Sequence, residues 1–187
     1  MKNQTKTNQQ AATNGTHAQD DIQKLGELIE DIQITMLTTV DEDGSLRSRP
    51  MVTQQIEFDG DLWFFTSASA AKVHEVQRNH QVNLAYANPD DQRYVSVSGT
   101  SELVRDRAKI TELWNPIYKA WFPAGLDDPD LALLKVQVEK AEYWESPSSK
   151  VVQLIGFVKA VATGKPYEGG KNEKIELGNT QAIAQDI

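Results

Sequence analysis

The sequence has no cysteine and no long apolar run. Without cysteine there can be no disulfide framework, no thiol nucleophile and no cysteine-rich zinc site. No apolar stretch approaches the roughly 20 residues that span a bilayer, and the polar N-terminus lacks the apolar segment of a secretory signal. We therefore expect a cytoplasmic protein with no membrane partner.

Positive charge is also scarce, because 19 Lys and Arg face 27 Asp and Glu for a net charge of -8. Nucleic-acid backbones are held by clustered cations, so no nucleic-acid partner is expected, although a local basic pocket is compatible with this charge. A Walker A loop, a Gly-x-Gly-x-x-Gly turn and a Gly-x-Ser-x-Gly elbow are all absent. These absences exclude the commonest nucleotide-binding folds and the α/β-hydrolases.

Histidine offers no metal site. His74 and Glu75 begin a zincin pattern, but Arg78 occupies the position of the second histidine. We interpret His17, His74 and His80 as surface residues, and no bound metal is expected.

The length of 187 residues and the balance of 39% hydrophobic to 25% charged residues fit one globular domain. Residues 1–20 are too polar to offset the entropy of ordering, so we expect a flexible N-terminal tail. Residues 167–187 carry only scattered hydrophobic side chains and are expected to form a flexible C-terminal tail. The predicted domain spans residues 21–166.

Strand-like and helix-like patterns alternate within this domain. Runs typical of strands cover residues 34–40, 46–58, 62–66, 82–87, 94–104 and 131–144. Helical spacing covers residues 21–30, 69–79, 106–121 and 147–163, the last with Ser146 or Ser148 as a cap. Turns at Asp43-Gly44 and Asp59-Gly60 join the first three strands without room for a crossover helix, so their pairing must be antiparallel. The pattern predicts an α+β barrel of about six strands.

The second predicted strand carries two arginines two residues apart. Alternation divides this strand into two faces, one with Arg47, Arg49, Met51, Thr53 and Gln55, the other with Leu46, Pro50, Val52, Ile56 and Phe58. We expect the arginine face to be polar and the other face to be core. The arginines would lie about 7 Å apart, a spacing suited to an anion. The alternative is a pair of solvated arginines on an exposed sheet face.

The third predicted strand opens directly into a helix. Ser69 is expected to cap this helix and to leave the amides of Ala70, Ala71 and Lys72 pointing outward with the positive end of the helix dipole. A lysine in the first turn opposes that dipole, which favours a bound anion there. This predicts a phosphate cradle without a glycine-rich loop, the alternative being that Lys72 simply faces solvent.

These segments together resemble a known family. The ordered set is Asp-Gly-x-x-x-Arg-x-Arg-Pro-Met, Leu-Trp-Phe-Phe-Thr-Ser, a lysine six residues after Thr66, Asn-x-x-Val-x-Leu and a late Glu-Tyr-Trp. It resembles the general stress proteins of the pyridoxamine 5'-phosphate oxidase-related FMN-binding split barrel superfamily, over about residues 21–163. The resemblance implies an antiparallel six-stranded split β-barrel with flanking helices, FMN as the cofactor, and a homodimer with FMN at the subunit interface.

The resemblance also implies roles for individual residues. Arg49 and Lys72 would bind the FMN phosphate, with Arg47, Ser67 and Ser69 in support. The isoalloxazine ring would be lined by Pro50, Met51, Phe65 and Thr66. We also include Ser48, which lies between the two arginines, among the cofactor-binding residues. Tyr94 falls where the oxidases place a flavin-contacting glutamine. Trp144 would reach the flavin of the partner subunit, or else would pack as a core or interface aromatic without a ligand.

Departures from the oxidases bear on the reaction. Gln54 replaces the lysine that holds the substrate phosphate, and the arginine and histidine expected about ten residues beyond Trp144 are missing, so vitamin B6 oxidation is not expected. The predicted function is a flavin-dependent oxidoreductase related to stress response, with a small-molecule redox partner and no identified catalytic side chain. Two alternatives remain open: a stress protein that stores or senses flavin without turnover, and a split barrel that holds deazaflavin or haem. The absence of a well-placed histidine ligand weakens haem.

Overall fold

The computed structural model describes residues 19–54, 58–146, 159, 161, 163 and 170–177. Its strands are β1 (Ile34–Val40), β2 (Leu46–Val52), β3 (Asp61–Ser67), β4 (Gln81–Asn88), β5 (Arg93–Val104), β6 (Leu131–Glu145) and β7 (Lys171–Glu176). Its helical elements are residues 19–29, α2 (Ala71–Arg78), α3 (Arg107–Leu113) and the 3-10 turns η1 (Pro116–Ala120) and η2 (Gly125–Asp127). None of the described helices combines the length and the apolar character that crossing a bilayer requires.

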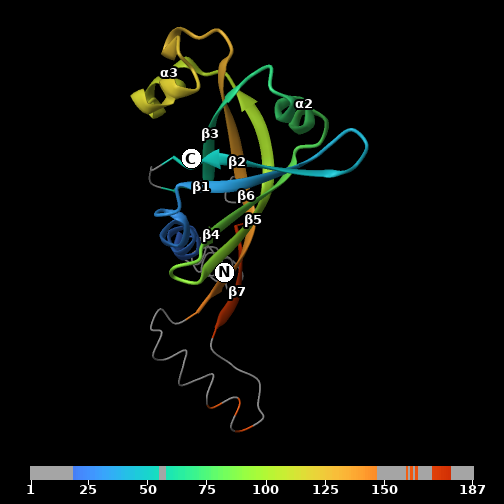
Figure 1. Ribbon diagram of the computed structural model, residues 1–187, viewed down its shortest axis with the longest axis vertical. Coiled ribbons are helices and arrows are strands. Elements are labelled where there is room, and N and C mark those ends of the chain that lie inside the picture. Colours follow the sequence, from blue (N-terminus) through green and yellow to red (C-terminus); the bar gives the residue numbers. More distant parts are fainter. Residues whose placement is uncertain are drawn as a thin grey trace, which may run out of the picture.

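The strands form one antiparallel sheet in the order β2-β1-β4-β5-β6-β3. β2 and β3 end this path and no ladder joins them among the described strands, so the sheet curves without closing. α2 and α3 lie on opposite sides of one end of the sheet (Figure 1). The α+β class and the antiparallel pairing are confirmed, and β7 raises the number of strands from six to seven. The prediction that the first three strands pair in succession was wrong beyond β1 and β2, because the partner of β3 is β6.

The seventh strand, β7, lies where the sequence predicts a tail. Its segment Lys171–Glu176 pairs antiparallel with the second half of β6, and Ile175 lies opposite Ala141. Ile175 and Leu177 are buried in the main core, whereas the rest of the strand is exposed. Two apolar side chains in a charged segment give too weak a pattern for a strand to be predicted. The strand forms because β6 offers backbone hydrogen bonds along this segment.

Two predicted boundaries were wrong. β2 ends at Val52, well before the end of the predicted run 46–58. The predicted helix 106–121 is broken after Leu113, and Pro116 opens η1 instead. Proline has no N–H for the helical hydrogen bond and its ring clashes with the preceding turn, so the helix cannot continue. The predicted helix 147–163 lies outside the described residues, except for positions 159, 161 and 163, which are helical.

Two cores hold the sheet. The larger one lies between the inner face of the sheet, helix 19–29 and α2, with Leu25, Leu37, Phe64 and Val76 almost fully buried. The smaller one packs α3 and η1 against β3 and β6. The helices therefore cover opposite faces of β3, which is why both of its faces are apolar.

The assignment of faces on β2 was also wrong. The arginine face turns inward, because Met51 and Thr53 are buried and the Arg49 side chain is only 22% exposed. Guanidinium groups tolerate this position only if other side chains satisfy them, and the structure supplies such partners. Within β2 the other face is outward up to Pro50, with Leu46 73% exposed, and only its last residue, Val52, packs against a core. Phe58, beyond the end of β2, packs against the main core as predicted.

Candidate functional site

The structure brings the predicted phosphate-binding cations together around a buried carboxylate. The Arg49 Nη2 atom donates to Glu75 Oε2 at 2.8 Å, and Arg49 Nη1 donates to Thr39 Oγ1 at 2.7 Å. Arg47 Nη1 lies 3.9 Å from Glu75 Oε1, and Lys72 is near enough for the charges of Arg49 and Glu75 to act on it. We call Thr39, Arg47, Arg49, Lys72 and Glu75 the basic cluster.

Glu75 is the residue around which the cluster is built. It lies on α2 and is only 3% exposed. Besides Arg49, the Thr39 hydroxyl donates to the same carboxylate oxygen. A buried charge is costly unless it is paired and hydrogen-bonded, so these contacts hold the carboxylate and the Arg49 guanidinium in one arrangement.

Lys72 is partly buried beside the positive charge of Arg49. Partial burial lowers the pKa of its ammonium group below the ordinary value, and the positive charge of Arg49 lowers it further, while Glu75 acts in the opposite direction. In the part of the chain that the structure describes, Arg49 uses two of its five N–H donors. An anion placed beside Lys72 and Arg49 would therefore be stabilised.

The hairpin between β1 and β2 is tied to α2 by exposed ion pairs. Asp41 accepts contacts from Arg47 at 3.2 Å and from Arg78 at 3.7 Å, and Arg78 also lies 3.2 Å from Glu42. Such exposed pairs contribute little stability. They do mean that Arg47 is shared between Asp41 and the basic cluster.

Ser69 does not cap α2, contrary to the sequence prediction. The N-cap is Ala70, which makes no side-chain cap hydrogen bond. Ser69 instead donates its hydroxyl to Asp130 Oδ2 at 2.6 Å and its amide to Oδ1 at 3.0 Å, and these bonds are the main reason why the pKa of Asp130 is lowered. Because no side chain caps them, the first amides of α2 beside Lys72 can receive an anion.

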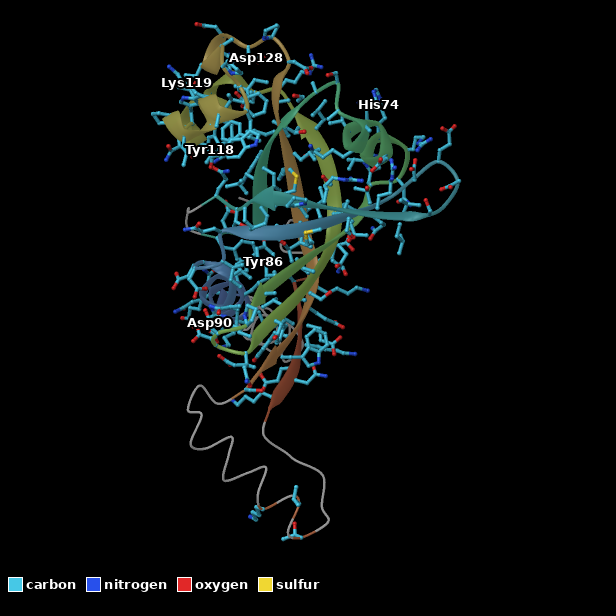
Figure 2. All side chains as sticks on the ribbon, viewed as in Figure 1. His74, Tyr86, Asp90, Tyr118, Lys119 and Asp128 are labelled. Atoms are coloured by element: carbon cyan, nitrogen blue, oxygen red, sulfur yellow. The ribbon has the colours of Figure 1, made fainter. Side chains whose placement is uncertain are left out.

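Two of the predicted ring-lining residues lie on opposite faces of β3. Thr66 is buried on the inner face, whereas Phe65 packs into the smaller core with ring centroids 4.6 Å from Tyr118 and 5.6 Å from Trp114. Tyr118 also donates its hydroxyl to Gln54 Oε1 at 3.1 Å. Figure 2 shows Tyr118 beside α3 and His74 on α2, on different sides of the sheet.

The other predicted residues of β2 differ in accessibility. The Met51 side chain is part of the main core. Pro50 and Ser48 are on the outer face, and the Ser48 hydroxyl lies 2.7 Å from that of Thr38. Ser67 is half-buried at the end of β3. A ring could therefore meet Met51 only through its backbone.

Tyr94 and Trp144 are not brought to the basic cluster within one chain. They pair directly across β5 and β6 on the outer face of the sheet and are 44% and 41% exposed. Arg49 is on the inner face of β2, at the far end of the strand order. Both groups could contact one ligand only if a second copy of the chain supplied one of them.

A cavity of about 340 Å³ lies elsewhere, between helix 19–29 and residues 53–54, 58 and 61–64. None of its lining residues belongs to the basic cluster. Within the described ranges, no three His, Cys, Asp or Glu side chains gather as metal ligands.

Sequence reasoning missed three residues of this region: Thr39, Glu75 and Asp130. Glu75 follows Lys72 by three positions, which places both on one side of the helix. Thr39 lies opposite Arg47 in the β1–β2 register, so the hairpin alone could have indicated it. Asp130 is 61 residues from Ser69 and only the pairing of β3 with β6 brings it close, so no local signal could have found it.

Comparison with known proteins places these features in context. The family described as pyridoxamine 5'-phosphate oxidase like matches residues 20–168. The chain is 29% identical over 171 residues to protein bli-3 of Neurospora crassa, covering 86% of this chain and 82% of that protein.

Solved structures agree with this match. The general stress FMN/FAD binding protein of Xanthomonas citri is 31% identical, with a TM-score of 0.60 over 70% of this chain and 92% of that one. A Clostridium acetobutylicum protein related to general stress protein 26 is 26% identical, with a TM-score of 0.59 over 65% and 86%. A candidate general stress protein 26 from Jannaschia sp., 24% identical, shares the fold with a TM-score of 0.66 over 84% and 98%.

Proposed function

The chain belongs to the pyridoxamine 5'-phosphate oxidase-like family, and on that premise we propose that it is an FMN-binding flavoprotein that transfers electrons between small molecules. The observation that carries this proposal is the basic cluster, in which Arg49 and Lys72 meet at the uncapped start of α2. The description of the Xanthomonas citri relative as an FMN/FAD binding protein supports the same ligand class.

The residues present fit a phosphate monoester. Arg49 keeps N–H donors beyond those given to Thr39 and Glu75, and Lys72 adds a partly buried ammonium group. Helix amides and charged side chains together form a usual phosphate site. Arg49, Lys72 and the first amides of α2 would hold the phosphate, with Arg47 in support, while Ser69 is occupied by Asp130.

The remaining predicted residues would orient the ring. Pro50, Phe65 and Thr66 lie near the ends of β2 and β3, where backbone and side-chain contacts would fix a planar group. FMN would supply the redox chemistry, and the protein would supply binding, orientation and exclusion of water.

The environment of Gln54 does not support oxidation of vitamin B6. This residue replaces the substrate-phosphate lysine, carries no charge, and binds the Tyr118 hydroxyl through its Oε1 atom. A side chain already held by a tyrosine in the smaller core is a poor receptor for a second phosphate.

A homodimer is part of the proposal. The outer face of the sheet carries a band of exposed apolar side chains that crosses from β2 to β6: Pro50, Ile34, Met36, Ala85, Ala87, Tyr94 and Trp144. Contiguous apolar surface of this kind marks an interaction site. A second copy covering the band would bury it and could bring Trp144 to the partner's flavin.

Replacing Ile34 with glutamate is expected to dissociate this dimer, because it places a charge in the middle of the apolar band, where the side chain is 50% exposed in one chain. We expect the dimer to be at least about ten-fold weaker, measured by sedimentation equilibrium. Ile117→Glu is the matched control, because Ile117 is 65% exposed on η1, outside the band. Equal effects of the two substitutions would contradict the proposed interface.

FMN affinity is expected to depend on pH through Lys72. Its folded-state pKa is lowered by burial and by Arg49. As pH rises through that lowered value, the ammonium group loses its proton, and the FMN phosphate loses a charged partner. Below about pH 6 affinity should also fall, because the phosphate gains a proton. Fluorescence titration should therefore show an alkaline decline for FMN but not for riboflavin. The variant Lys72→Arg, which stays charged, should lose that decline.

The proposed function is tested by the absorption spectrum of the purified protein, with the released cofactor identified by mass. A flavin spectrum with FMN released supports it, and a colourless protein that takes up no added FMN refutes it. Steady-state oxidation of NADH or NADPH, compared with free FMN at equal concentration, separates electron transfer from storage. A rate no greater than that of free FMN would contradict the catalytic part and leave the binding part intact.

A further inference from the structure

Glu75 is a buried titratable group that FMN binding, as proposed above, does not use directly. Glu75 is 3% exposed, and within the part of the chain that the structure describes its carboxylate pairs with Thr39, Arg47 and Arg49 of the basic cluster. Replacing Glu75 alone with an apolar residue would leave the half-buried Arg49 guanidinium without its carboxylate partner. Its partners are the same residues that would hold the phosphate, which connects Glu75 to the ligand.

On the basis of the proposed FMN site, we propose that Glu75 is its positioning residue. The carboxylate fixes the Arg49 guanidinium through a shared hydrogen-bond network and keeps a negative charge beside Lys72. Arg49 is thereby ordered, and the positive charge of Lys72 is favoured, before the phosphate arrives.

The positioning role rests on a closed triangle of hydrogen bonds. Thr39 donates to Glu75 Oε2 and accepts from Arg49 Nη1 at 2.7 Å, while Arg49 Nη2 donates to the same Glu75 oxygen at 2.8 Å. Both terminal nitrogens of the guanidinium are therefore anchored. An arginine held in this way loses less side-chain entropy when it binds a ligand than a free one does.

The charge role rests on what surrounds Lys72. Arg49 and burial lower the pKa of the ammonium group, and Glu75 is the group that raises it. The other charged or titratable groups on the neighbouring elements are Arg47 on β2, His74 and Arg78 on α2, and Asp41, Glu42 and Asp43 in the β1–β2 turn. Of the strands packed against α2, β1 carries no charged residue, and β5 carries Arg93 and Glu102 near its two ends. Removing the Glu75 charge must therefore favour the neutral amine.

The experiment measures FMN and riboflavin affinity of the full chain by flavin fluorescence from about pH 6 to about pH 10. It compares the unaltered protein with Glu75→Gln, which removes the charge but keeps an acceptor oxygen. It also includes Thr39→Val, which removes the hydroxyl, and Thr39→Ser, which keeps it. Riboflavin reports damage to the ring site or to the fold, because it lacks the phosphate.

Four results are expected. In Glu75→Gln the alkaline decline of FMN affinity moves to lower pH. In Thr39→Val the FMN affinity falls about five-fold at every pH without moving the decline, because one hydrogen bond to Arg49 is lost. Thr39→Ser binds FMN like the unaltered protein, and riboflavin affinity is the same throughout.

The proposal is overturned if Glu75→Gln leaves the decline in place, or if the substitutions weaken FMN and riboflavin equally. Should Glu75→Gln fail to fold, the contrast between Thr39→Val and Thr39→Ser decides the positioning role. If the unaltered protein binds FMN no more tightly than riboflavin at any pH, the proposed function itself is refuted. The proposed role of Glu75 is then refuted as well, because it depends on a phosphate site.

Discussion

Lys72→Ala is expected to bind FMN about ten- to a hundred-fold more weakly than the unaltered protein, because a hydrogen bond between charged groups contributes roughly 1.5 to 3 kcal/mol. Lys72 is in the first turn of α2, and its partly buried ammonium lies beside Arg49 in a region that favours an anion. Riboflavin affinity should barely change. The measurement is a pair of fluorescence titrations, one with each flavin, near neutral pH.

The control for this prediction is Lys109→Ala. Lys109 is also a half-buried lysine, but it is on α3, where it pairs with Glu112 and contacts the Trp63 ring. Its loss should leave the affinity for both flavins unchanged. If Lys72→Ala weakens riboflavin as much as FMN, Lys72 supports the fold or the ring and does not bind the phosphate.

Gly99→Ala is expected to destabilise the protein by about 3 kcal/mol, because the new methyl group would collide with backbone and not with a movable side chain. A Cβ atom at position 99 would lie 2.0 Å from the Gln137 carbonyl oxygen and 2.9 Å from its carbon. This contact occurs where the register of β5 and β6 shifts, between Ser98 and Gly99. The central ladder of the sheet must open to accommodate it.

Thermal or urea unfolding followed by circular dichroism measures this loss, and a decrease of about 10 °C in the melting temperature is expected. Gly26→Ala is the matched control, because its Cβ would meet Phe58 Cβ at 3.4 Å, an ordinary contact, and because alanine favours the surrounding helix. That substitution should change stability by less than about 1 kcal/mol. An equally mild effect at position 99 would show that the ladder can shift freely.

The positions of the cations could be predicted from the sequence, but their environment could not. Arg49 follows from strand alternation and Lys72 from the start of a helix, and both are local patterns. The inward orientation of the arginine face was predicted wrongly, because its compensating carboxylate, Glu75, is 26 residues away. A charged side chain is usually exposed to solvent. It can be buried only if a partner, here one distant in the sequence, satisfies its charge.

Ser69 illustrates the same limit at the start of α2. Serine before a helix favours capping, and the sequence therefore predicts it as the cap. Asp130 competes for its hydroxyl and amide, and Ala70 becomes the N-cap. A local preference of about 1 kcal/mol is readily exceeded by two hydrogen bonds to a carboxylate.

By itself, the sequence determined the α+β class, the antiparallel pairing of strands, the family, and the two cations on which the proposed function rests. These features depend on patterns within a few residues: alternation, turns and helix starts. The tertiary structure alone decided which face of β2 is buried, which carboxylate orders Arg49, and that β7 completes the sheet. Those outcomes depend on contacts between residues far apart in the chain, whose energies no local pattern contains.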